Sequence, residues 1–176
     1  DIYSYDVKTQ EWSPVNPKGN PPKERGGHTA CLLPDGKRIM IYGGWSGMSQ
    51  YFNCYIYDTE KDEWVDLDTP TDEPRWNHCA VIVPCLPESK LFVFGGERAN
   101  FEDGAVRQFG ELDNTVSYME LTKDLKAKKF INVPIPDQKE DQKPLPRENS
   151  VMFYDKYDQR LIIFGGWSGN YLNDIW

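Results

Sequence analysis

The chain repeats itself with a period near 50 residues. Tyr3–Trp12 recurs as Tyr55–Trp64, 52 positions on, with two Tyr, an Asp, a Glu and a Trp in the same places. An apolar run closed by two glycines, Ile41–Gly44, recurs as Val93–Gly96 and again as Ile163–Gly166. Markers that recur in the same order and phase predict a repeat architecture, in which each unit is a small supersecondary structure stacked on the next.

Each period is expected to contain four short strands. Asp35-Gly36 between the first two apolar runs is a tight-turn sequence that suits a hairpin. Runs such as Leu161–Phe164 lack alternation, which is typical of strands covered on both faces, and no segment carries a helical stripe. The sequence therefore predicts an all-β fold. The expected strands are 28–33, 38–42, 54–58 and 63–67 in the first full unit, 78–83, 91–94, 115–121 and 129–133 in the second, and 150–154 and 161–164 in the third.

The doubled glycine closing the second strand, with Tyr and Trp spaced across the third and fourth, resembles the kelch repeat over essentially the whole chain. The resemblance implies a β-propeller of four-stranded antiparallel blades, here an incomplete one with about three blades. The remaining blades are expected from the rest of a longer polypeptide. Trp12 and Trp64 are expected to be buried between blades, with Phe130 taking that place in the second unit. The expected units are 1–24 (the end of a preceding blade), 25–74, 75–146 and 147–176 (the start of a further blade).

Charge and composition exclude several classes of partner. With 28 acidic and 20 basic residues the formal net charge is −8, and no basic stripe is present, which argues against nucleic acid or an anionic membrane as the partner. No apolar run approaches the roughly 18 residues needed to cross a bilayer. The cysteines lack metal-site spacing and are expected to be reduced thiols of an intracellular protein, cytoplasmic or cytoskeletal. They are Cys31, Cys54, Cys79 and Cys85.

No catalytic residue, metal ligand or cofactor is expected in this segment. His28 and His78 lie 50 residues apart in equivalent phases of the repeat. Both are expected to be structural, inside their blades, hydrogen-bonded to neighbours and far from each other. No phosphate-binding glycine loop and no nucleophile-elbow sequence is present. The propeller portion of a metal-dependent enzyme remains an alternative.

The long connections predict a protein-binding face. In a four-stranded blade the loops after the second and fourth strands emerge at one end, and the other turns emerge at the opposite end. The long segments 14–24, 45–53, 68–74, 97–114 and 134–148 all belong to the first set, whereas the opposite turns 34–37 and 59–62 are short. Long loops on a rigid scaffold are typical of binding surfaces. We therefore expect a non-catalytic protein–protein interaction module that binds through this face.

Arg and aromatic side chains are the types enriched at binding hot spots, so they are the candidate contacts on this face. Trp45 and Trp167, each directly after a doubled glycine, either cap a blade or face a partner. In the loop 97–114, Phe101 and Phe109 are expected to make buried contacts and Arg98 and Arg107 to set the register. The candidate partner-binding residues are Arg98, Phe101, Arg107, Phe109, Trp45 and Trp167.

Kelch propellers as a family mostly serve as protein-binding modules, among them scaffolds, ubiquitin-ligase substrate adaptors and parts of ciliary machinery. The style of Gly165–Ile175 and the acidic, Trp-rich blades are similar to kelch segments in axonemal proteins, such as outer-arm dynein heavy chains. This resemblance implies a place in a cilium or flagellum. A substrate adaptor of a ubiquitin ligase is the other alternative.

Overall fold

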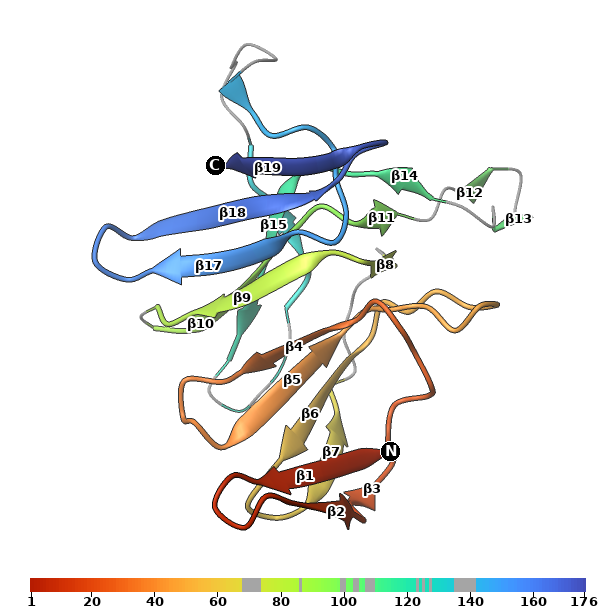
Figure 1. Ribbon diagram of the computed structural model, residues 1–176, viewed down its shortest axis with the longest axis vertical. Coiled ribbons are helices and arrows are strands. Elements are labelled where there is room, and N and C mark those ends of the chain that lie inside the picture. The colour runs from red at the N-terminus through yellow and green to blue at the C-terminus, as the bar shows by residue number, and fades with distance from the viewer. Residues whose placement is uncertain are drawn as a thin grey trace.

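The computed structural model describes residues 1–67, 74–85, 87–98, 101–102, 105–106, 110–122, 124, 126, 128–134 and 142–176. In this part of the chain the regular structure is all-β, as predicted, and the sheets follow one another in chain order (Figure 1). Among these residues no helix has the length and apolar character that a membrane span requires.

The first complete blade confirms the predicted four-stranded unit. Its four main strands pair antiparallel with their neighbours in chain order. They are β4 (Thr29–Leu32), β5 (Arg38–Tyr42), β6 (Cys54–Asp58) and β7 (Glu63–Asp66). The segment 14–24, expected to be a loop, is partly a strand, because β3 (Lys18–Gly19) adds to the outer edge in parallel with β7.

The second blade has the order β16-β15-β10-β9, and the third sheet has the order β17-β18-β19. The doubled glycines directly follow β5 and β10, as predicted, whereas Gly165-Gly166 lies inside β18 at a register shift. The strands are β9 (Cys79–Val83), β10 (Ser89–Phe94), β15 (Val116–Leu121), β16 (Ile131–Asn132), β17 (Val151–Asp155), β18 (Arg160–Trp167) and β19 (Tyr171–Ile175).

Beyond β10 the chain leaves the blade and builds a small three-stranded sheet at the blade end. There β11 (Glu97–Arg98) pairs antiparallel with both β8 (Arg75–Trp76) and β14 (Glu111–Leu112). A two-stranded ribbon of β12 (Phe101–Glu102) and β13 (Ala105–Val106) extends from it.

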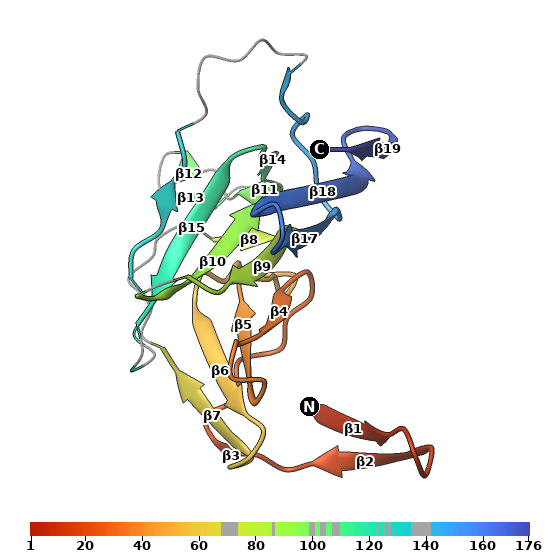
Figure 2. The ribbon, with the colours of Figure 1, turned by 90° about the vertical axis from the view of Figure 1, so that its left-hand side faces the viewer.

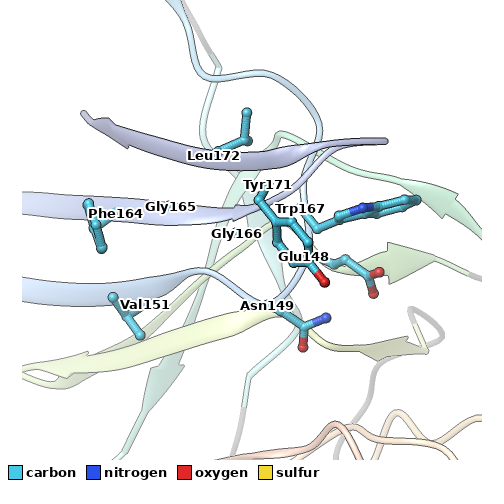
Figure 3. A pocket seen from close by; sticks show the side chains of 9 residues that line it. All are labelled: Glu148, Asn149, Val151, Phe164, Gly165, Gly166, Trp167, Tyr171 and Leu172. Carbon is cyan, nitrogen blue, oxygen red and sulfur yellow. The ribbon is translucent and has the colours of Figure 1, made fainter.

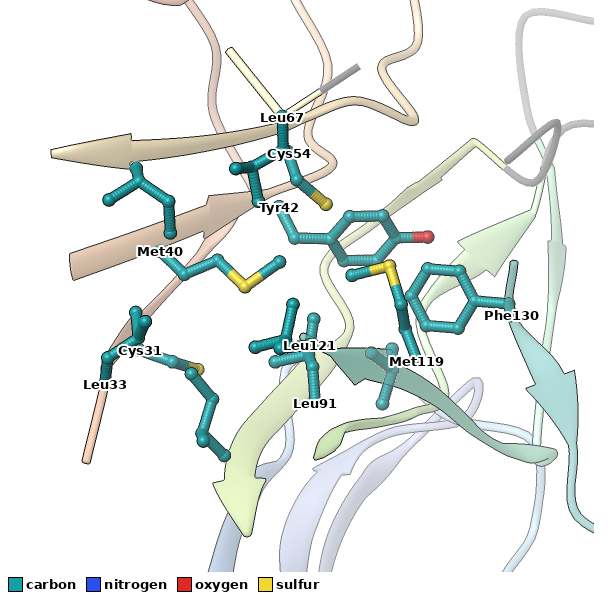
Figure 4. Close-up of a cluster of buried hydrophobic side chains, with 13 residues drawn as sticks. Cys31, Leu33, Met40, Tyr42, Cys54, Leu67, Leu91, Met119, Leu121 and Phe130 are labelled. Atoms are coloured by element: carbon teal, nitrogen blue, oxygen red, sulfur yellow. The ribbon is translucent and has the colours of Figure 1, made fainter. Parts of the chain in front are cut away.

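The core lies between the blades, which pack face to face. The innermost strand of each sheet packs on that of the next, β4 on β9 and β9 on β17 (Figure 2). Each buried large apolar side chain stabilises the fold by roughly 1.5–3 kcal/mol. The cluster between the first two blades (Figure 4) comprises Cys31, Leu33, Met40, Tyr42, Cys54, Ile56, Leu67, Ile82, Leu91, Val93, Met119, Leu121 and Phe130. Cys79, Phe94, Met152 and Ile163 join the second blade to the third.

Three side chains test the predicted aromatic packing between blades. Phe130 is buried, with its ring centroid 5.0 Å from that of Tyr42, as expected. The prediction for Trp12 is wrong: it is 68% exposed, because β1 (Ile2–Asp6) and β2 (Glu11–Val15) pair only with each other within the described residues. Trp64 is half-buried rather than buried, and packs against Tyr55 and Tyr57.

All four thiols are free in the structure. Cys31, Cys54 and Cys79 are buried and Cys85 is half-buried. Burial raises the pKa of the Cys31 thiol to about 11 and that of Cys79 to about 12. These two groups are therefore protonated, unreactive core side chains at neutral pH.

Candidate functional site at the loop end of the blades

The described parts of the connections after β5 and β10 lie at the end of the blades opposite the short hairpin turns, as predicted, whereas 68–73 and 135–141 lie outside the described residues. Figure 1 shows the hairpin turns between β4 and β5 and between β17 and β18 on one side. The segment after β5 and the small sheet of β8, β11 and β14 lie on the other. We call this second side the loop face.

An arginine closes the loop end of each blade by binding the doubled glycine of that blade. The Nη1 atoms of Arg25, Arg75 and Arg147 donate to the carbonyl oxygens of Gly43 (2.9 Å), Gly95 (2.9 Å) and Gly165 (3.0 Å). Arg75 and Arg147 are buried almost completely. Each therefore needs a second partner, which a residue just before or within the third strand supplies.

That second partner is a carboxylate in two blades and an amide in the first. Asp113 Oδ2 lies 3.0 Å from Arg75 Nη2, and Asp174 Oδ2 accepts a bond of 2.8 Å from Arg147 Nη2. In the first blade Asn53 Oδ1 takes this place, 3.0 Å from Arg25 Nη1. The three arginine clamps are structural, since they tie loop ends to strands inside the fold.

Hydrogen bonds between blades continue the same pattern. The N–H of Gly44 donates to the carbonyl of Arg75 (2.9 Å), and that of Gly96 donates to the carbonyl of Arg147 (2.8 Å). The residue after each doubled glycine is thereby held next to the residue after the arginine of the following blade. This places distant parts of the sequence side by side on the loop face.

At the first junction between blades the two side chains so placed are tryptophans. The rings of Trp45 and Trp76 are stacked, with centroids 6.4 Å apart and an interplanar angle of 27°. Trp76 is buried and Trp45 is half-buried. The predicted site residue Trp45 therefore caps a blade junction and still presents part of its ring.

At the second junction the equivalent positions hold two carboxylates, Glu97 and Glu148. Glu97 pairs across strands with Trp76, whose indole hydrogen-bonds to its carboxylate, and it accepts a bond of 3.2 Å from the Gly110 N–H. Glu148 accepts a bond of 2.7 Å from Asn77 Nδ2. Burial, then the negative charge of Glu148 and the hydrogen bond between the two side chains, raise the pKa of the Glu97 carboxyl.

Trp167 ends this row of side chains. It pairs with Glu148 through an antiparallel bridge, and its side chain is 37% exposed. Beside it runs a groove of about 520 Å³, lined at the loop end by Glu148, Asn149, Trp167 and Tyr171 (Figure 3). Trp45, Trp76, Glu97, Glu148 and Trp167 thus form one row across three blades, which we call the loop-face row.

The other predicted contact residues lie outside this row or outside the described residues. Arg98 is half-buried, with its Nε 3.0 Å from Asp113 Oδ2, and shares that carboxylate with Arg75. Phe101 lies in β12, where only its backbone is described. Arg107 and Phe109 lie outside the described residues. The prediction that these loop side chains contact a partner stays a prediction.

The histidines only partly follow their prediction. His78 is buried and its Nε2 hydrogen-bonds to Thr29 Oγ1 (2.9 Å), as expected. Burial, then the charges of Arg75 and His28, lower its pKa to about 3. His28 is exposed rather than inside its blade. The two histidines are also not far apart, because His78 lies beside Gly43 and His28 beside Gly44, close enough for the charge of His28 to act on His78. Among the described residues no three His, Cys, Asp or Glu side chains are grouped to hold a metal ion.

Replacing Glu97 by Gln is expected to stabilise the chain by about 1 kcal/mol at pH 7, the scale of one hydrogen bond. The pKa of Glu97 is higher in the folded chain than in the unfolded chain, so the protonated Glu97 stabilises the fold. This stabilisation is fully present below the unfolded-state pKa of Glu97 and is lost as pH rises through its folded-state pKa. The amide introduced by Glu97→Gln donates to Glu148 at every pH. Thermal unfolding as a function of pH measures the difference, with the exposed Glu111→Gln as the control for loss of one charge. Equal pH profiles for wild type and Glu97→Gln would contradict the shared hydrogen bond.

The sequence interpretation missed the carboxylate pair and the arginine clamps. Arg25, Arg75 and Arg147 recur in phase with the doubled glycines, a signal that could have assigned them to the loop ends. Glu97 and Glu148 are 51 residues apart and follow no shared motif. Only the packing of the second blade on the third brings them together.

Comparisons with known proteins agree with the fold. The sequence model of the KLHDC2/KLHL20/DRC7 Kelch-repeats domain matches residues 1–176. Kelch domain-containing protein 3 of Bos taurus is 34% identical over 104 residues, 57% of this chain and 26% of the relative. The dynein alpha chain of the flagellar outer arm of Chlamydomonas reinhardtii is 22% identical over 227 residues, 99% of this chain and 5% of that protein.

A solved structure shares the architecture. The structure titled "Structure of YjhT" has a TM-score of 0.63 and 16% sequence identity, covering 98% of this chain and 47% of that one. The chain therefore spans about half of that protein and about a quarter of the kelch relative.

Proposed function

This chain belongs to the kelch-repeat family, and we propose that it binds other proteins through its loop face within a larger intracellular assembly. Kelch domains generally mediate protein–protein interactions, which supports a binding role for this chain. The loop-face row is the observation that carries the proposal. It presents partly exposed tryptophans, a residue type enriched at binding hot spots, on a rigid frame of arginine clamps.

We expect Trp45→Ala together with Trp167→Ala to weaken partner recovery by about tenfold or more, the scale of a hot-spot loss. Both rings are partly exposed on the loop face, so their loss removes contact area. The matched control is Lys37→Ala with Lys61→Ala, two exposed side chains at the opposite, short-turn end. Quantitative mass spectrometry of proteins recovered on the immobilised chain measures the effect.

Thermal unfolding of both variants checks that the fold survives. If the control pair lowers recovery and the tryptophan pair does not, binding uses the short-turn end and the proposal is wrong.

We further propose a ciliary setting, as part of an axonemal dynein heavy chain or another ciliary kelch protein. Similarity to the flagellar outer-arm dynein alpha chain over 99% of this chain supports it. An antibody to the chain should label isolated axonemes after detergent extraction of the membrane. Recovery of ubiquitin-ligase subunits in place of axonemal proteins would favour the adaptor alternative.

A further inference from the structure

The two blade junctions differ in the chemistry that they present on the loop face. The first junction is closed by the stacked rings of Trp45 and Trp76. At the second junction Glu97 and Glu148 occupy the positions that correspond to Trp45 and Trp76. Two acidic groups therefore lie side by side at the second junction, where the first junction has two apolar rings. A carboxylate pair at this point does not improve packing between blades, and its chemistry suits a bound cation.

The surrounding donors orient the two carboxylates without neutralising them. The Gly110 N–H and the Trp76 indole hold Glu97, and the Asn77 side chain holds Glu148. These donors carry no formal charge. The guanidinium groups nearby bind other carboxylates, Arg75 and Arg98 at Asp113 and Arg147 at Asp174.

Aromatic rings flank the pair on both sides. Trp76 is the cross-strand neighbour of Glu97, and Trp167 that of Glu148. Tyr171, 92% exposed, and Trp167 form the wall of the groove beside Glu148 (Figure 3). Carboxylates between aromatic faces suit a basic side chain, whose head pairs with the acids while its alkyl stem lies on the rings.

We propose that the loop face recognises a basic segment of a partner protein, which places a Lys or Arg head group on the Glu97–Glu148 pair and its stem against Trp167 and Tyr171. The chain's net charge of −8 is complementary to such a segment. This rests on the proposed loop-face function and names the partner's chemistry.

The test uses a fluorescent peptide of about 12 residues, the length of a short binding segment, with Lys and Arg separated by Gly and Ser. A matched peptide carries Glu in place of each basic residue. Fluorescence anisotropy with the full chain should show binding of the basic peptide alone. The double substitution Glu97→Gln and Glu148→Gln should weaken that binding by about tenfold or more, the loss expected for a charge-assisted contact. Glu60→Gln with Glu11→Gln, both exposed and outside the small sheet of β8, β11 and β14, is the control of equal charge change.

The pH profile separates this site from general attraction to an acidic surface. A bound cation replaces the proton that the pair shares, so wild-type affinity should rise as increasing pH passes through the raised pKa of Glu97, and should then level off. Glu97→Gln should flatten this rise. Of the other titratable groups near the row, His78 stays neutral over this range, with its pKa lowered to about 3, and the exposed His28 is present in both proteins.

The other possible results of the peptide test separate the loop-face function from the recognition of a basic segment. No binding by the wild type, equal binding of the acidic peptide, or no effect of the double Gln variant would overturn recognition of a basic segment. If the tryptophan pair still reduces partner recovery in that case, the loop-face function stands and only the partner's chemistry is wrong.

Discussion

Replacing Arg147 by Ala is expected to destabilise the fold by about 3 kcal/mol, because it removes a fully buried side chain together with several of its hydrogen bonds. Arg147 is fully buried and donates to the carbonyls of Leu145 and Gly165 and to both oxygens of Asp174. Its removal loses all of these bonds and empties a fully buried position at the loop end of the third sheet. Urea unfolding followed by tryptophan fluorescence measures the loss.

The control for Arg147 is Arg160→Ala, which removes an exposed guanidinium paired with Asp155 and Asp158. Exposed pairs contribute about 0–1 kcal/mol, so this variant should unfold almost as the wild type does. Equal losses in the two variants would show that the clamp has no special role.

The ion pair of Arg147 with Asp174 also makes the stability of the fold depend on pH in the acid range. Hydrogen bonds from Arg147 lower the pKa of Asp174 to about 2. A lowered folded-state pKa gives a stabilising contribution that is present above the unfolded value, about 3.9, and is lost as pH falls toward 2. Arg147→Ala should remove this component of the acid transition.

Replacing Gly96 by Ala is expected to cost about 3 kcal/mol or more, because strain and overlap act together. Gly96 has φ +81°, where L-residues are strained, and a Cβ there would lie 2.7 Å from the His78 nitrogen and against the Trp76 carbonyl oxygen. Backbone atoms cannot move aside as a flexible side chain can. The segment Trp76–His78 that leads into β9 must therefore shift away from the end of β10, and thermal unfolding should show a large fall in midpoint.

Gly36→Ala is the matched control for Gly96. Gly36 has φ +70° in the hairpin turn, and a Cβ there would meet no atom within 4 Å. The control therefore carries the conformational strain alone, about 1–2 kcal/mol. If both variants lose the same stability, the close approach of Gly96 to the Trp76 and His78 backbone within the second blade does not matter.

The strands themselves could be predicted from sequence because their signals are local. Apolar runs, the Asp35-Gly36 turn and the doubled glycines lie within a few residues of the elements that they define. The predicted strands 38–42 and 54–58 match β5 and β6 residue for residue. The prediction that Trp12 is buried was wrong for the opposite reason. Burial of this side chain depends on what packs against β1 and β2, and the sequence of these two strands does not determine that.

The sequence by itself determined the repeat, the all-β blades and the end of the blades at which the long connections lie. Tertiary structure alone decided which side chains meet there. Hydrogen bonds from Gly44 to Arg75 and from Gly96 to Arg147 set the alignment of successive blades. That alignment stacks Trp45 on Trp76 and places Glu97 against Glu148. Such contacts join residues far apart in the chain, and no local pattern encodes them, because they depend on how one sheet packs on the next.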